Sequence, residues 1–123
     1  MSKRNWQDFV QDMLESIQKV EDYSGHLTSE EFFVDGKTQD AVIRNLEIIG
    51  EAARRIPDEI QQRHADIPWT QVVGLRNRLV HGYFVVDLTI VWEICKHDLP
   101  RLRVRLEQLL QEEAPRESSN PSE

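Results

Sequence analysis

Apolar residues recur at steps of three and four along most of the chain, which is the spacing of one face of an amphipathic α-helix. The first long run covers residues 5–23, and capping and acidic residues then predict a short helix over residues 28–33. A second long run covers residues 38–55. A proline follows it, so residues 57–66 predict another short helix.

Two further helices are predicted in the second half of the chain. One covers residues 69–81, with Gly82 placed as its left-handed C-terminal residue. The other covers residues 88–112, and its apolar side chains alternate steps of four and three, which favours near-parallel packing against a neighbouring helix. Because Pro100 removes one helical hydrogen bond, we expect a kink at residues 97–99.

No stretch alternates convincingly between apolar and polar residues, and the strand-like residues 83–87 are too few to build a sheet. The expected fold class is therefore all-α, an up-down bundle of four or five helices with a kinked C-terminal helix. We expect one helical domain over residues 4–113. Residues 114–123 are rich in Pro, Ser and Glu and are expected to be a disordered tail.

Charge and cysteine content narrow the classes of function. The chain has 15 Lys and Arg against 22 Asp and Glu, a net charge of −7. This balance argues against a passive nucleic-acid coat protein, but it leaves room for an enzyme with a small local basic site. Cys95 is the only cysteine, so no intrachain disulfide is expected, and the composition suits a reducing cytoplasm. We expect no signal peptide and no membrane span.

Metal and nucleotide-loop motifs are missing from the sequence. The four histidines include no His-x3-His pair, and Glu47 and Glu51 lack the Glu-x-x-His partner of di-iron bundles. The glycine patterns of nucleotide-binding loops and the hydrolase nucleophile elbow are also lacking. We therefore expect no metal and no cofactor.

The helix predicted over residues 69–81 carries Arg76, an arginine whose position in the helix makes it a candidate functional residue. At about 100° per residue from Trp69, Arg76 falls within the same stripe as Val73. A guanidinium aimed at a core or interface needs a partner, and its planar donors match a carboxylate or a phosphate. One interpretation is a structural salt bridge to Glu47 or Glu51, which share a polar helix face with Arg44.

His81 follows five residues after Arg76. Histidine is the side chain best suited to proton transfer near neutral pH, although at a helix C-terminus it also serves as a simple cap. In an ideal helix the two residues lie about 140° apart. They converge if the helix unwinds at Gly82, or if a second subunit shares the cleft.

The last predicted helix carries a positive patch of Lys96, Arg101, Arg103 and Arg105, with Asp98 among them. Such a run is usually a solvated helix face. It also suits RNA phosphates or an acidic partner.

Residues 67–100 resemble the HepT-like toxins of the HEPN superfamily. The family signature Arg-x4-His-x-Tyr is met by Arg76, His81 and Tyr83, and the polar residue that often follows the arginine is Asn77. The upstream RNLEIIGEAARRIP, residues 44–57, also resembles this family.

The resemblance implies a metal-independent endoribonuclease toxin of a type II- or VII-like toxin–antitoxin pair in the cytoplasm. Members are α-helical homodimers whose motif arginine and histidine line a cleft between subunits. Their partner is a minimal nucleotidyltransferase (MNT-type) antitoxin, which in the family transfers AMP to the motif tyrosine, here Tyr83. The substrate implied is RNA.

Elementary chemistry agrees with these roles. His81 would act as general base or acid, Arg76 would balance the charge that builds on phosphorus, and Asn77 would orient the phosphate or His81. Two alternatives stay open. In the first, the chain is a non-catalytic helical module that binds a nucleotide or a nucleotidyltransferase. In the second, it is a structural dimer in which Arg76 forms a salt bridge to Glu47 or Glu51.

Overall fold

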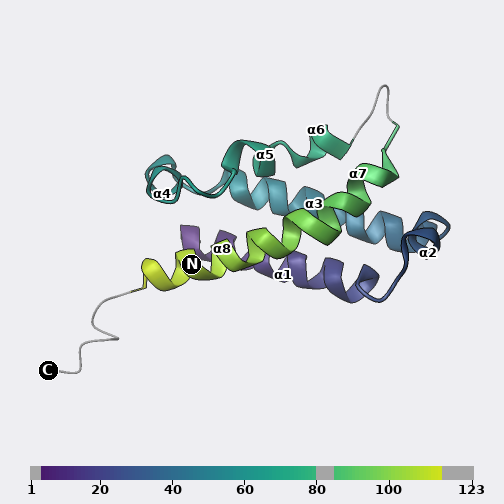
Figure 1. Ribbon diagram of the computed structural model, residues 1–123. Coiled ribbons are helices and arrows are strands. Elements are labelled where there is room, and N and C mark those ends of the chain that lie inside the picture. Colours follow the sequence, from purple (N-terminus) through teal and green to yellow (C-terminus); the bar gives the residue numbers. More distant parts are fainter. Residues whose placement is uncertain (1–3, 80–84, 115–123) are drawn as a thin grey trace, which may run out of the picture.

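The computed structural model describes residues 4–79 and 85–114, and these ranges form helices that run alternately up and down with no β-sheet (Figure 1). The prediction of an all-α up-down bundle is confirmed. Its four arms are α1, α3, the α5–α6 segment and the C-terminal α7–η1–α8 arm. The bounds are α1 Trp6–Ser24, α2 Ser29–Phe33, α3 Gly36–Arg54, α4 Asp58–Arg63, α5 Trp69–Val73, α6 Leu75–Leu79, α7 Leu88–Glu93, the π-helix η1 Ile94–Asp98 and α8 Leu99–Glu112.

Side-chain caps start the helices close to where the sequence places them. The Asn5 side chain accepts from the Asp8 backbone N–H at the start of α1, and the Thr28 side chain accepts from the Glu31 backbone N–H at the start of α2. Asp87 accepts from two backbone N–H groups at the start of α7. Each cap satisfies donors that have no partner within the helix, which fixes the first turn. α3 begins two residues earlier than predicted, because Asp35 caps it.

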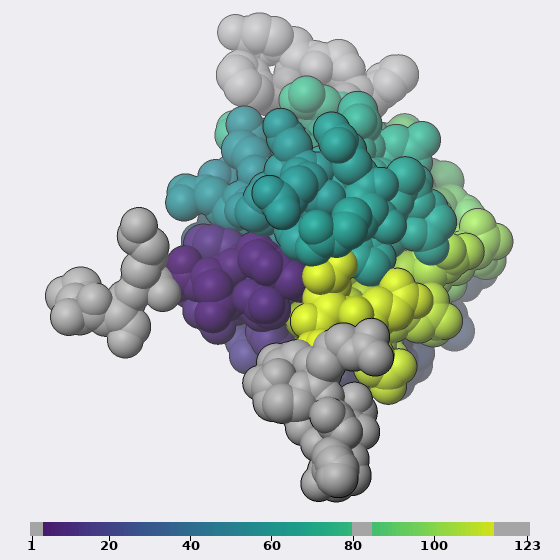
Figure 2. Space-filling model, turned by 90° about the vertical axis from the view of Figure 1, so that its left-hand side faces the viewer, coloured from purple at the N-terminus to yellow at the C-terminus, as the bar shows by residue number. Residues whose placement is uncertain are grey.

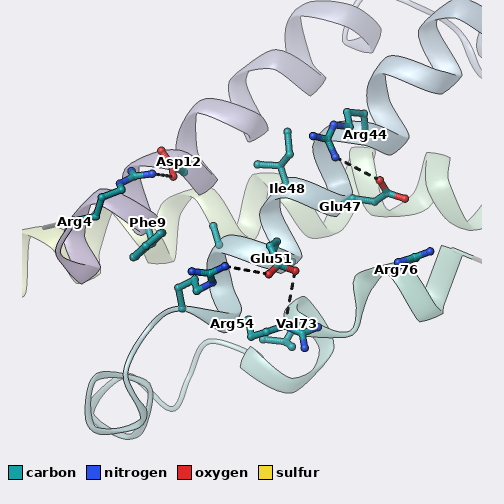
Figure 3. Close-up of a pocket in the computed structure, with 13 residues that line it drawn as sticks. Arg4, Phe9, Asp12, Arg44, Glu47, Ile48, Glu51, Arg54, Val73 and Arg76 are labelled. Carbon is teal, nitrogen blue, oxygen red and sulfur yellow. Dashed lines mark ion pairs between the residues drawn. The ribbon is translucent and has the colours of Figure 1, made fainter.

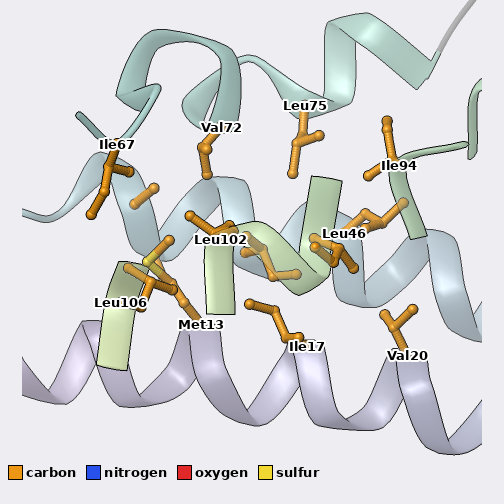
Figure 4. Close-up of a cluster of buried hydrophobic side chains, with 14 of the residues drawn as sticks. Met13, Ile17, Val20, Leu46, Ile67, Val72, Leu75, Ile94, Leu102 and Leu106 are labelled. Carbon is orange, nitrogen blue, oxygen red and sulfur yellow. The ribbon is translucent and has the colours of Figure 1, made fainter. Parts of the chain in front are cut away.

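The hydrophobic core lies between the four arms (Figure 4). Side chains from every arm meet there at steps of three and four, as the periodicity predicts. Its most deeply buried large side chains are Phe32, Met13, Leu46, Ile49, Leu79, Ile94, Leu106 and Leu109.

The predicted single helix over residues 69–81 is wrong. α5 ends at Val73, Gly74 interrupts the helix and α6 begins at Leu75, so the angular register drawn from Trp69 does not hold across the break. The buried stripe consists of Trp69, Val72, Leu75 and Leu79. Arg76 is therefore exposed rather than part of an apolar stripe.

The C-terminal arm is distorted just before Pro100. The five residues Ile94–Asp98 form a π-helix, in which the Leu99 N–H donates to the Ile94 carbonyl oxygen. Proline cannot donate the next helical hydrogen bond, and a π-turn is a common way to absorb such an interruption. The π-helix thus overlaps the predicted kink. The buried seam of this arm continues across it and consists of Cys95, Leu99, Leu102, Leu106 and Leu109.

The end of α8 adjoins α4, as the yellow and teal surfaces of Figure 2 show. Arg63 donates two hydrogen bonds to Glu113, at 3.0 and 2.8 Å, and the Nε2 atom of His64 lies 2.8 Å from the same carboxylate. These contacts hold the Glu113 pKa at about 2, mainly through the hydrogen bond from Arg63. These contacts join α4 to the end of α8 at one end of the bundle (Figure 1).

Three predictions lie outside the described residues. They concern His81, Gly82 with Tyr83, and the tail beyond residue 114. Within residues 4–79 and 85–114, no helix has the length and apolar character needed to span a membrane.

Candidate functional site

A groove of about 810 Å³ carries five arginines in its lining. α1 and the residues just before it, α3, and the α5–α6 segment all contribute to it (Figure 3). Three carboxylates, from Asp12, Glu47 and Glu51, share the lining, so positive charge is in excess. We call this site the arginine groove; its arginines are Arg4, Arg44, Arg54, Arg55 and Arg76.

Several ion pairs in the arginine groove are long. The Nη1 atom of Arg44 lies 4.0 Å from Glu47, while Arg54 and Arg55 approach the two oxygens of Glu51 at 3.9 and 3.7 Å. These separations exceed hydrogen-bond lengths and hold exposed side chains, so each pair contributes little stability.

Arg76 is placed in the same groove from α6. Among the described residues it has neither a hydrogen-bond partner nor an ion-pair partner, and Figure 3 shows it with no dashed line to Glu47 or Glu51. The salt bridge considered from the sequence is therefore not formed within those residues. The carboxylates of Glu47 and Glu51 instead face Arg44, Arg54 and Arg55.

A close backbone contact positions α5 and α6 over the groove. Gly50 is buried in α3, and a Cβ atom placed there would lie 3.1 Å from the Val72 carbonyl oxygen and 3.4 Å from that of Val73. These contacts are tighter than most Cβ atoms make, so a side chain at this position would push the two backbones apart, whereas glycine allows the close approach. The lack of a side chain at Gly50 thus sets the distance between α3 and the α5–α6 segment, which carries Arg76.

Asn77 and Arg78, the neighbours of Arg76 on α6, do not line the arginine groove. Asn77 is exposed. Arg78 donates to Asp98 on η1 at 3.0 Å, which ties α6 to the C-terminal arm. The structure thus brings together Arg76, Arg44, Glu47 and Glu51 of the predicted site residues, and it does not bring Asn77 into that lining.

Sequence reasoning missed the contribution of α1. Arg4 lies 3.0 Å from Asp12, a contact that raises the pKa of this arginine, and its guanidinium stands 4.8 Å from the centre of the Phe9 ring. Periodicity assigns Phe9 to the core stripe, but the ring is half-buried and lines the groove. Arg55 reaches the same ring from α3, at 5.9 Å. No local sequence signal indicates this meeting of two helices.

The described residues give little support for a metal site or a cysteine nucleophile, and side chains of the C-terminal positive patch are engaged within the fold. Residues 4–79 and 85–114 contain no group of three or more His, Cys, Asp and Glu side chains that could hold a metal ion. Burial raises the pKa of the Cys95 thiol to about 12, so this cysteine is no nucleophile near neutral pH. In the positive patch of the C-terminal arm, Lys96 stacks on Trp92, Arg103 donates to Gln18 and Arg105 pairs with Asp66.

The fold and site define an all-α helical bundle with a groove rich in arginines, one of which, Arg76, has no partner within residues 4–79 and 85–114. Comparison with known families is more specific, since the Ribonuclease HepT-like family matches residues 13–109. The chain belongs to the HepT-like ribonuclease family, an enzyme family of endoribonucleases.

Curated relatives agree with this assignment. A protein of Thermococcus cleftensis named "Probable ribonuclease HepT" is 41% identical over 107 residues, which cover 87% of this chain and 97% of the relative. A protein of Methanocaldococcus jannaschii named "Putative RNase" is 40% identical over 107 residues, covering 87% of this chain and 98% of that protein. No solved structure gives a significant match.

Proposed function

We propose that this protein is the metal-independent endoribonuclease toxin of a toxin–antitoxin pair, and that Arg76 and His81 act on RNA at a cleft between two subunits. The observation that carries the proposal is the position of Arg76, exposed in a cationic groove with no partner among the described residues. Family membership supplies the reaction class. Action on cellular RNA places the protein in the cytoplasm.

The proposed reaction is attack of a ribose 2′-hydroxyl on the adjacent phosphorus. His81 removes the hydroxyl proton or protonates the leaving 5′-oxygen, and a second proton carrier completes the transfer. The O2′–P bond forms and the P–O5′ bond breaks, which leaves a 2′,3′-cyclic phosphate and a 5′-hydroxyl. Arg76 stabilises the negative charge that builds on the phosphoryl oxygens, and Asn77 orients the phosphate or His81.

A homodimer accounts for the second proton carrier. Two subunits facing one another supply two copies of Arg76 and His81 to one cleft, so one imidazole acts as base and the other as acid. This arrangement also brings together residues that an ideal helix would hold about 140° apart.

The proposed antitoxin is an MNT-type nucleotidyltransferase that transfers AMP from ATP to Tyr83. The tyrosine oxygen bonds to the α-phosphorus, the bond from that phosphorus to the bridging oxygen breaks, and pyrophosphate leaves. An AMP group two residues from His81 adds negative charge and bulk, so it would compensate Arg76 and exclude RNA. Mass spectrometry of the chain after incubation with its partner and ATP should find the added AMP on Tyr83. Added mass elsewhere, or none, would count against this part of the proposal.

A histidine substitution tests the proposed function. His81→Ala should fold as the wild type does, by circular dichroism and thermal melting, yet lose both RNA cleavage and toxicity in cells. Full activity of that folded variant would reject the catalytic role of His81. His97→Ala, the same substitution at an exposed histidine of η1, is the matched control and should keep its activity.

The alternative is a non-catalytic module that binds a nucleotide or the nucleotidyltransferase through Arg76 and His81. Expression without the partner gene separates the two functions. A ribonuclease toxin arrests growth when expressed alone, whereas a docking module leaves growth unchanged.

A further inference from the structure

Two sets of arginines in the described residues differ in their contacts. In one set each guanidinium donates a hydrogen bond to a side chain on a distant segment of the chain; it consists of Arg63, Arg78, Arg103 and Arg105. These arginines join parts of the fold. Arg54 and Arg55, in contrast, make no hydrogen bond through their guanidinium groups within the described residues, and both face the arginine groove.

Arg54 and Arg55 share one weak acidic partner. Both approach Glu51 at more than 3.5 Å, with Arg54 63% and Arg55 58% exposed. One carboxylate therefore faces two guanidinium groups, which leaves an unbalanced positive charge at this end of the groove. Arginine is weakly hydrated and carries planar N–H donors that match phosphate oxygens.

The rest of the groove fits an RNA strand. Arg76, the arginine proposed to act at the scissile phosphate, lines the same groove as Arg54 and Arg55. Phe9, Ile48 and Val73 add apolar surface to the lining of the groove. A groove that combines cationic side chains with an aromatic ring is typical of proteins that bind single-stranded nucleic acid through backbone phosphates and base faces. A volume of about 810 Å³ is enough for part of such a strand.

We propose that Arg54 and Arg55 form a binding subsite for the phosphates of single-stranded RNA that flank the bond cleaved at Arg76. This inference rests on the proposed ribonuclease function and adds to it the surface along which the substrate lies. Because the whole chain carries a net charge of −7, the groove gathers positive charge on an otherwise acidic molecule. RNA is thereby directed to one face.

Binding of an RNA that cannot be cleaved tests the subsite separately from catalysis. The probe is a fluorescently labelled single-stranded oligoribonucleotide of mixed sequence with 2′-O-methyl groups, which block 2′-hydroxyl attack. The Arg54→Ala/Arg55→Ala variant should bind it roughly tenfold more weakly or worse, because two charge-assisted phosphate contacts are lost. The slope of log K against log salt concentration should become shallower by about 1.4, given ~0.7 per phosphate contact for single strands.

The control removes two arginines from the other positive surface. Arg101→Ala/Arg103→Ala changes the charge of α8 by the same amount and should leave RNA affinity within about twofold of the wild type. Arg54→Lys/Arg55→Lys keeps the charge and should recover part of the affinity. Circular dichroism and thermal melting establish that each variant is folded.

Cleavable RNA of the same sequence gives a second readout. The Arg54→Ala/Arg55→Ala variant should show a raised KM with kcat close to that of the wild type, since these residues hold the strand rather than the reacting atoms. Wild-type affinity of this folded variant for the methylated RNA would overturn the subsite, as would a loss of affinity only in the α8 variant. Absence of any cleavage by the wild type, with groove-dependent binding intact, would instead reject the ribonuclease function and leave the subsite standing.

Discussion

Arg76 shows how a single residue joins fold and proposed chemistry. It projects from a five-residue helix into a groove whose other arginines face acidic residues, while Arg76 itself has no partner in the described chain. An exposed guanidinium pays little desolvation cost and remains available to a ligand. The position of Arg76 therefore suits stabilisation of the negative charge that builds on the phosphate during cleavage better than it suits a structural salt bridge.

Replacement of this guanidinium should affect the chemical step. Arg76→Ala is expected to lower kcat by roughly 10²- to 10³-fold, the usual effect of removing one charge-stabilising donor, with a smaller change in KM. Arg76→Lys should be intermediate, because a lysine keeps the charge but not the planar pair of donors. Single-turnover cleavage of a labelled RNA measures both. An alanine variant as fast as the wild type would remove Arg76 from the mechanism.

Glu51 is expected to oppose RNA binding, because its carboxylate competes with phosphate for Arg54 and Arg55. Glu51→Gln should bind the methylated RNA about two- to fivefold more tightly, in keeping with the small strength of exposed ion pairs. Glu107→Gln, an exposed substitution on α8, is the control for the change in net charge. Equal effects of the two substitutions would show a general charge effect instead of a local one.

At the scale of elements, the positions of the helices follow from local sequence patterns, whereas the arginine groove depends on how the helices pack together. Apolar periodicity and the caps at Asn5, Thr28 and Asp87 are properties of short segments, so the sequence predicts them within a few residues. The break at Gly74 escapes prediction, because apolar residues at helical spacing continue on both sides of it. The contribution of Arg4 arises only when α1 packs beside α3.

The contact at Gly50 should govern how α5 and α6 sit on α3. Gly50→Val places a branched side chain against the backbone oxygens of Val72 and Val73, so we expect a loss of about 1–3 kcal/mol in the free energy of unfolding. Cleavage should fall as well, because Arg76 moves with α6. Gly36→Val is the matched control, since a Cβ atom there meets nothing within 4 Å.

Urea unfolding gives the two free energies, and a cleavage assay below the transition gives the activity. If Gly50→Val and Gly36→Val lowered the free energy of unfolding and the cleavage activity equally, the role assigned to the close backbone contact would be contradicted.

At the scale of the whole molecule, the Glu113 contacts join α4 to the end of α8 and make the stability of the fold depend on pH. Folding lowers the pKa of Glu113 from 4.5 to about 2. A lowered carboxyl pKa stabilises the fold fully above about pH 4.5, and this stabilisation is lost as the pH falls towards 2. Glu113→Gln should therefore cost on the order of 1 kcal/mol at neutral pH, allowing for solvent screening, and should flatten the acid limb of the stability curve.

Thermal melting across that pH range compares the variant with wild type and with Glu107→Gln. If all three proteins lose stability in parallel below pH 4.5, the junction between α4 and the end of α8 contributes nothing specific.

The central claim is that the protein cuts RNA by 2′-hydroxyl attack without a metal ion, and mapping of the cut ends in the presence of EDTA tests it most directly. The account predicts continued cleavage in the chelator, with 2′,3′-cyclic phosphate and 5′-hydroxyl ends, by the wild type and not by Arg76→Ala or His81→Ala. Cleavage that stops in EDTA and returns with a divalent ion, or ends bearing a 3′-hydroxyl and a 5′-phosphate, would contradict it.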